Sequence, residues 1–117
     1  MQIIFLSVTP SASASYLCLL QVRHPHCVQI MAAGLLPSDP FIVMEWVAGG
    51  TWFDKLAEDP PPPAHQRIRA VREASSALQY LHDPLIALIH GDVKSLNLLI
   101  MCDGSSKVNA ACASCFA

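Results

Sequence analysis

The feature that most constrains the fold is a stretch of helical periodicity from Ala64 to His82. Apolar side chains recur there at three- and four-residue spacing, which predicts an amphipathic helix of about five turns. We expect the apolar face to be buried and the opposite face to lie in solvent. The apolar face holds Ile68, Val71, Ala74, Ala77, Leu78 and Leu81, and the polar face holds Gln66, Arg67, Arg69, Arg72 and Glu73.

The segments before this helix predict a small sheet and a short helix. Residues 28–36 and 41–47 are apolar runs separated by Pro, Ser and Asp, which predicts two antiparallel strands joined by a turn. Thr51 is placed to cap a short helix that ends at Leu56, with Asp54 in its first turn. The prolines at 60–63 then form a stiff, extended spacer.

The composition indicates one small globular domain. Of its 117 residues, 53% are hydrophobic and 14% are charged, which excludes a disordered polyelectrolyte. A net charge of −2 without a dense Lys/Arg cluster gives no electrostatic footprint for nucleic acid. No unbroken apolar run reaches about 18 residues, so we expect no membrane span.

The cysteines favour a reduced, cytoplasmic setting over a secreted disulfide framework, because their number is odd and their spacing irregular. They are Cys18, Cys27, Cys102, Cys112 and Cys115. The last two form a lone C-x-x-C; a zinc site would need a second ligand pair, so loose thiols are the favoured interpretation.

Residues 1–16 contain a short apolar run followed by an Ala-x-Ala pattern at Ala12 and Ala14, as in a signal peptide, but they lack a positive start. We interpret this segment as a poorly structured or strand-like leader. Residues 15–22 resemble the end of an apolar-faced helix, which Pro25 interrupts.

A polar loop follows the long helix. The stretch "HGDVKSLNLLI", residues 90–100, places a carboxylate, a lysine and an amide between Asp92 and Asn97 and then becomes apolar. After the strand that this apolar run predicts, "CDGSS" is a turn of the Asp-Gly type, and Lys107 and Val108 begin a returning strand. The polar loop therefore lies between a long helix and a tight hairpin.

This loop resembles the catalytic loop of eukaryotic protein kinases, H-R-D-L-x-x-x-N, with matches at His90, Asp92 and Asn97. Three further stretches agree in order and spacing: "RHPHCVQI" with the entrance to the fourth strand, "FIVMEWVAGGTWFDKL" with the fifth strand and hinge, and "ALQYLH" with the end of the long helix. The resemblance implies an α+β, incomplete protein-kinase-like fold comprising part of the small-lobe sheet, the hinge, the long helix and the catalytic loop. It implies a leader at 1–16, a partial kinase domain at 17–108 and a divergent tail at 109–117.

The resemblance assigns catalytic roles in the loop. Asp92 would accept or orient the proton of the substrate hydroxyl, Lys94 would contact the γ-phosphate of ATP, and Asn97 would offer an oxygen ligand to Mg²⁺. A lysine two residues after the aspartate resembles Ser/Thr kinases, in particular the tyrosine-kinase-like group. The implied substrate is therefore a protein with a Ser or Thr acceptor.

It also assigns a nucleotide site. Met44 would be the gatekeeper behind the adenine, and the hinge would run from Glu45 to Val47 and bind adenine through the Glu45 carbonyl and the Val47 amide. Leu99 would form the apolar floor beneath the ring. Taken singly, Met44 and Leu99 fit ordinary core packing better than a nucleotide site, and only their register with the other motifs gives them this role.

Several parts of the family pattern do not occur in these 117 residues. The sequence contains no G-x-G-x-x-G loop, no V-A-I-K lysine and no D-F-G, and Ala110 occupies the position of the metal-binding Asp. Gly91 stands where arginine is usual, so the loop lacks the contact that this arginine makes with a phosphorylated residue. A compatible interpretation is that Gly91 provides backbone freedom in the loop. We therefore expect this chain to be part of a protein kinase domain and to be inactive in isolation. The alternative is a catalytically dead, kinase-derived interaction module.

Overall fold

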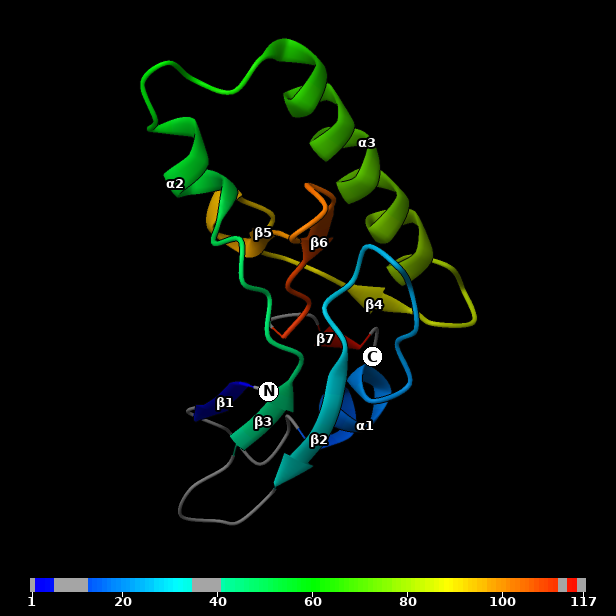
Figure 1. The fold of residues 1–117 in the computed structure, drawn as a ribbon. Coiled ribbons are helices and arrows are strands. Elements are labelled where there is room, and N and C mark those ends of the chain that lie inside the picture. The colour runs from blue at the N-terminus through cyan, green and yellow to red at the C-terminus, as the bar shows by residue number, and fades with distance from the viewer. Residues whose placement is uncertain (1, 6–12, 35–40, 112–113, 116–117) are drawn as a thin grey trace.

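The computed structural model describes residues 2–5, 13–34, 41–111 and 114–115. Its three-stranded sheet lies at one end of the molecule and the helices α2 and α3 lie at the other (Figure 1). The elements in chain order are β1 Gln2–Phe5, α1 Ser13–Leu19, β2 Ile30–Gly34, β3 Phe41–Met44, α2 Trp52–Leu56, α3 Ala64–Leu81, β4 Leu88–Ile89, the 3₁₀ turn η2 Ser95–Asn97, β5 Leu98–Ile100, β6 Ser106–Val108 and β7 Ser114–Cys115.

The sheet has the order β1-β3-β2, with both neighbours antiparallel to the central strand. The predicted pairing of two strands before the short helix is thus confirmed, while the turn between them falls outside the described residues. β1 comes from the segment interpreted as a leader, and its strand-like alternative agrees with the structure. Along β3, Ile42 and Met44 are buried and Phe41 and Val43 are half-buried, as expected for a strand with one face on the core.

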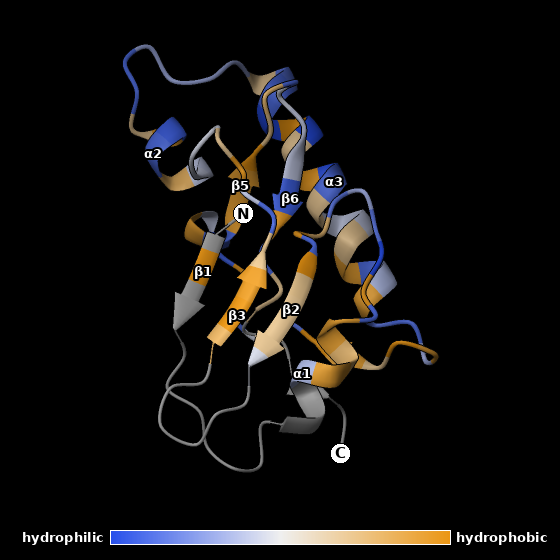
Figure 2. Ribbon diagram, turned by 60° about the horizontal axis from the view of Figure 1, so that its bottom comes forward, coloured by the Kyte–Doolittle hydropathy of each residue, from blue (hydrophilic) through white to orange (hydrophobic). Residues whose placement is uncertain are grey.

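The main core gathers side chains from α1, the sheet, α3 and β4. Its most deeply buried members are Leu19, Val28, Ile42, Met44, Leu81 and Leu88. Figure 2 shows that β3 and β5 are mainly apolar, whereas α3 alternates between apolar and polar positions. The core therefore joins the small sheet to the C-terminal half of the long helix and leaves the polar loop at its margin.

The short helix and the long helix form as predicted. The Thr51 hydroxyl accepts the Asp54 N–H at 3.2 Å and caps α2, and its own O–H donates to the Asp54 carboxylate at 2.7 Å. The long helix ends one residue before the expected boundary, with His82 as its C-cap. The N-terminal helix is shifted, because α1 spans Ser13–Leu19 rather than residues 15–22.

The burial of α3 differs from the prediction at three positions. Ile68 and Val71 are 60% and 65% exposed, and Glu73 is buried. Glu73 can be buried because its Oε2 accepts the Ser106 N–H at 2.6 Å and its Oε1 accepts the Arg69 Nε–H at 2.8 Å. The face of α3 that packs on β6 is thus offset from the apolar stripe, and consists of Ala70, Glu73, Ala77 and Leu81.

The segment after β3 is fastened to β5. The Gly49 N–H donates to the Ile100 carbonyl at 2.9 Å, and the Ile100 N–H donates to the Gly50 carbonyl at 2.9 Å. A Cβ at Gly49 would collide with that same Ile100 carbonyl, so this close approach requires glycine. The segment after β3 is therefore held, at Gly49 and Gly50, against the strand that follows the polar loop.

The C-terminal part forms two short antiparallel pairs. β5 and β6 form the predicted hairpin, with Gly104 at φ 80° in its Asp-Gly turn. β4 pairs with β7, in the segment expected to diverge, and Cys112 lies outside the described residues. Within the described part of the chain, no helix combines the length and apolar character needed to cross a membrane.

Candidate functional site

The three predicted catalytic side chains lie together in the polar loop. The Lys94 ammonium is 2.8 Å from Asp92 Oδ2, and the Asn97 Nδ2 donates to that same oxygen at 3.1 Å and to the Asp92 carbonyl at 2.8 Å. The η2 turn brings Asn97 back over the loop, and the Asn97 N–H donates to the Lys94 carbonyl at 2.9 Å. The structure therefore places a carboxylate, a cation and an amide within hydrogen-bond reach of one another.

The carboxylate of Asp92 is exposed and ionised. The hydrogen bond from Lys94 is the largest influence on the pKa of Asp92 and lowers it; desolvation, the next largest, opposes this, and the charge of Lys94 and the hydrogen bond from Asn97 lower the pKa further. About half of both the Asp92 and Lys94 side chains remains accessible. The charged form of Asp92 can therefore accept a proton from an incoming hydroxyl.

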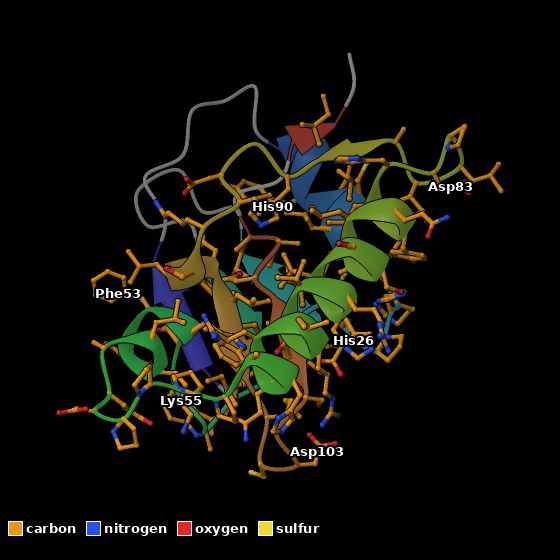
Figure 3. The ribbon with its side chains drawn as sticks, turned by 90° about the horizontal axis from the view of Figure 1, so that it is seen from above. His26, Phe53, Lys55, Asp83, His90 and Asp103 are labelled. Carbon is orange, nitrogen blue, oxygen red and sulfur yellow. The ribbon has the colours of Figure 1, made fainter. Side chains whose placement is uncertain are left out.

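His90 anchors the start of this loop from the interior, where Figure 3 shows it. It is buried; its Nδ1 accepts the Asp92 N–H at 3.2 Å, and its Nε2 lies 2.8 Å from the Asn109 carbonyl. These partners assign the proton of the neutral ring to Nε2. The Asn109 N–H donates in turn to the Asn97 carbonyl at 2.8 Å.

Asn109 thus connects both ends of the loop. Its role was not predicted, because Asn109 falls in the segment expected to be a divergent tail. Its only signal in the sequence is its position directly after the predicted returning strand.

Gly91 adopts a left-handed backbone with φ 76°, and a Cβ there would meet no heavy atom within 4 Å. Of the two interpretations of this residue, the structure supports glycine's backbone freedom, because an L side chain in this region is strained whatever the space around it.

The predicted nucleotide residues lie on β3, the following segment and β5. Met44 is buried in the core, Val47 is buried and Leu99 is half-buried. Within the described part of the chain, neither the Glu45 carbonyl nor the Val47 N–H makes a hydrogen bond to another residue. Both backbone groups are therefore available to a planar ring that presents a donor and an acceptor.

The side chain of Glu45 has a role that the sequence did not indicate. Its Oε1 lies 2.6 Å from the Lys107 ammonium and accepts the Gln29 N–H at 2.8 Å. This half-buried ion pair joins the segment after β3 to β6.

An apolar groove of about 460 Å³ lies between α2, α3 and the polar loop. Leu56 and Val71 line its helical walls, and Val93 and Leu98 line its loop side, while Lys94 and Asn97 lie at its edge. This groove explains the exposure of the predicted core residue Val71.

Comparison with known proteins places these features in a family. The family model described as protein kinase domain matches residues 12–109. The chain belongs to the protein kinase family. Its curated relatives include R818 of Acanthamoeba polyphaga mimivirus, named as a serine/threonine-protein kinase/receptor, with 37% identity over 90 residues. They also include the serine/threonine-protein kinase PknB of Mycobacterium leprae, with 35% identity over 91 residues.

These matches cover about three quarters of this chain but a small part of each relative. The match to R818 covers 75% of the chain and 5% of that protein, and the match to PknB covers 74% of the chain and 14% of that protein. The small sheet, the long helix and the hairpin thus represent a protein kinase domain with small-lobe-like strands.

The protein kinase family uses ATP and Mg²⁺, and the residues of this chain suit the adenine of ATP better than they suit the metal ion. The unbonded backbone groups of Glu45 and Val47 suit an adenine ring. The residues do not fit Mg²⁺, because Ala110 is buried and its side chain has no oxygen to bind the ion. The described residues also contain no group of three or more acidic, His or Cys side chains that could hold a metal ion. Asn97 and the exposed Asp92 carboxylate, which is paired with Lys94, are the amide and the carboxylate of this loop.

Proposed function

We propose that this chain is part of a Ser/Thr protein kinase domain and that it does not transfer phosphate by itself. The family activity is ATP-dependent phosphorylation of Ser or Thr side chains in proteins. The observation that carries the proposal is the donor set: Asp92, Lys94 and Asn97 are assembled, but Ala110 is buried where the family has a metal-binding Asp. A cytoplasmic setting is part of the proposal and rests on the odd, irregular cysteines.

The assembled loop suits the substrate side of this chemistry. Asp92 would accept the proton of a Ser or Thr hydroxyl, since its carboxylate is accessible. The lowered pKa of Asp92 keeps this carboxylate in the charged form that can act as an acceptor. Lys94 would neutralise developing negative charge beside it, and Asn97 would hold the carboxylate in place through its 3.1 Å hydrogen bond. The D-x-K-x-x-N spacing and the names of the relatives both support a Ser/Thr acceptor.

The chain provides only part of a nucleotide-binding site. The Glu45 carbonyl and Val47 amide would bind adenine, with Met44 behind the ring and Leu99 beneath it. The edge strand β1, which pairs with the central strand β3, has the sequence "QIIF" and contains no lysine to contact the phosphates. ATP, when bound, supplies the phosphoryl group; we expect this chain to bind it weakly, through the base alone.

The test is a phosphorylation assay with Mg-ATP and a generic protein acceptor rich in Ser and Thr. We expect no incorporation above the level of the Asp92→Asn variant, while a relative with complete motifs labels the acceptor in parallel. Incorporation by the unmodified chain that disappears in Asp92→Asn would overturn the proposal. Asp92→Asn is a suitable control because the side chain keeps its size and exposure and loses only its charge.

The alternative function is a catalytically dead interaction module, and the apolar groove beside α3 favours it. The two proposals differ in their response to nucleotide. A kinase-derived site that retains adenine binding should be stabilised by Mg-ATP or ADP in a thermal unfolding experiment. A module that acts only through the groove should show no such shift, and Val71→Lys should reduce its binding to a partner protein.

A further inference from the structure

The turn at residues 82–87, here called the knob, carries the most exposed large apolar side chain among the described residues. That side chain is Leu85, which is 93% exposed. Figure 1 shows that the segment between α3 and β4 projects from the side of the molecule. Single exposed leucines are common on protein surfaces, so the meaning of this one depends on how the turn is built and on which surface it would fit.

The knob is held in a defined shape by Asp83. The Asp83 carbonyl accepts the N–H groups of Ile86 and Ala87 at 2.9 and 2.7 Å. Its Oδ1 accepts the Leu85 N–H at 2.9 Å. The ring of Pro84 restricts the backbone at the tip, and Ala87 closes the turn with φ 53°. Leu85 is therefore presented by an ordered turn, and little chain entropy is lost when it enters another surface.

The apolar groove beside α3 offers a surface that such a knob fits. Leu56, Val71 and Val93 line it, and Val71 and Val93 are mostly exposed. Its volume of about 460 Å³ lies within the range of ~300–1,000 Å³ found for small-molecule sites. The groove thus has room for the Leu85 side chain together with the ring of Pro84.

The two surfaces also carry opposite charges that are not paired within the molecule. Arg67 lines the groove and is exposed, and in the described part of the chain its side chain forms no hydrogen bond or ion pair. The lysine of the groove, Lys94, is already paired with Asp92. On the knob, Asp83 is exposed, and its carboxylate has no cationic partner among the residues that the structure describes. A knob that enters the groove can bring Asp83 to Arg67.

The knob of a molecule cannot reach Arg67 of the same molecule. Arg67 lies near the start of α3 and the knob follows its last residue, so at ~1.5 Å per residue the two are about 22 Å apart along the helix. In Figure 3, Asp83 lies on the opposite side of the view from Phe53 and Lys55 of α2, the helix that flanks the groove. The occupant that fits both surfaces is therefore a second copy of this chain.

We propose that the chain associates with itself through a knob-to-groove contact, in which Leu85 of one copy enters the apolar groove of another and Asp83 of the first pairs with Arg67 of the second. The contact joins two different surfaces, and it depends on neither nucleotide binding nor phosphoryl transfer. The inserted leucine supplies most of the attraction, and the exposed ion pair sets its direction. Because the contact is smaller than a stable interface, association is reversible and increases with protein concentration.

The experiment is sedimentation equilibrium of the whole chain over a range of concentrations, with a reductant present because Cys102 is exposed. Leu85→Ser removes the apolar tip of the knob and should weaken association at least about tenfold. The matched control is Leu17→Ser, because Leu17 is 58% exposed on α1 and belongs to neither surface. This control should associate as the unmodified chain does.

The groove is tested by Val71→Glu, which sets a carboxylate against the knob and one helical turn from Arg67. It should weaken association as strongly as Leu85→Ser, whereas Gln79→Glu, at an exposed position of α3 outside the groove, should not. Mixing the two variants is the decisive step. The Leu85→Ser chain keeps an intact groove and the Val71→Glu chain keeps an intact knob, so the mixture should associate although neither variant does so alone.

The ion pair is tested by Asp83→Asn, which keeps an oxygen for the Leu85 N–H and loses only the charge. It should weaken association by up to about fivefold, as should Arg67→Gln, and the two changes together should weaken it no more than either alone.

Three results would overturn the proposal. The first is an unmodified chain that stays monomeric over the whole concentration range. The second is a Leu85→Ser chain that associates normally while Val71→Glu does not, which would indicate contact between two grooves. The third is a mixture of the two variants that fails to associate, which would indicate that each change acts on general aggregation instead of on one side of a specific contact.

Discussion

The two faces of α3 contain similar amounts of apolar sequence but have different surroundings. The face towards β6 buries Ala77 and Leu81 together with a charged residue, Glu73, whereas the face towards the groove leaves Val71 mostly exposed. Burial of each side chain is thus decided by which element lies opposite it. Hydrophobic periodicity identifies a helix and its apolar stripe, but does not identify the part of that stripe that has a partner.

The β6-facing side also shows how a charged residue can belong to a core. Ser106 is buried and bonds to three segments of the chain. Its N–H donates to Glu73 of α3, its carbonyl contacts His26 in the loop before β2, and its hydroxyl accepts the Trp52 Nε1–H of α2 at 2.8 Å. Among the described residues, no buried side-chain nitrogen or oxygen lacks a partner. This network joins α2, α3 and β6 around the strand that precedes Asn109, and so supports the polar loop indirectly.

The largest expected effect is on the buried face. Leu81→Ala removes a fully buried side chain from the centre of the core and should lower the free energy of unfolding by about 2 to 5 kcal/mol. Chemical denaturation followed by circular dichroism measures this difference. A loss below about 1 kcal/mol would mean that the C-terminal half of α3 does not pack as the structure shows.

A smaller effect is expected from the buried carboxylate. Glu73→Ala leaves the buried Ser106 N–H without its acceptor and should cost about 1 to 3 kcal/mol. The control is Arg69→Ala, which removes only the half-exposed partner and should cost less than about 1 kcal/mol. If both variants lost the same free energy of unfolding, the bond from Glu73 to Ser106 would not be the one that stabilises the fold, and the prediction would be wrong.

The smallest effect on stability is expected on the groove-facing side. Val71→Lys should change the free energy of unfolding by no more than about 0.5 kcal/mol, because the side chain is already exposed. The same substitution should reduce self-association, since exposed apolar patches promote it. Light scattering measures this, with Gln79→Lys, an exposed position outside the groove, as the control for added charge. A strong destabilisation by Val71→Lys would show that the groove face is covered in solution.

The sequence predicted more of the site than of the packing. The loop from His90 to Asn97, the hairpin after it and the capped helix at Thr51 follow from motifs and turn chemistry that act over a few residues. The structure brings Asp92, Lys94 and Asn97 together as those motifs imply. By contrast, the Glu45–Lys107 ion pair and the contact from His90 to Asn109 join residues 62 and 19 positions apart. No local pattern encodes such pairs.

The sequence by itself therefore determined the order and type of the main elements, the catalytic-loop motif and the family, because each depends on short-range spacing of side chains. It could not determine which face of α3 is buried, that Glu73 belongs to the interior, or that Asn109 bonds to both ends of the polar loop. Only the tertiary structure decided these, because burial and hydrogen bonding depend on the atoms that distant segments bring opposite each side chain.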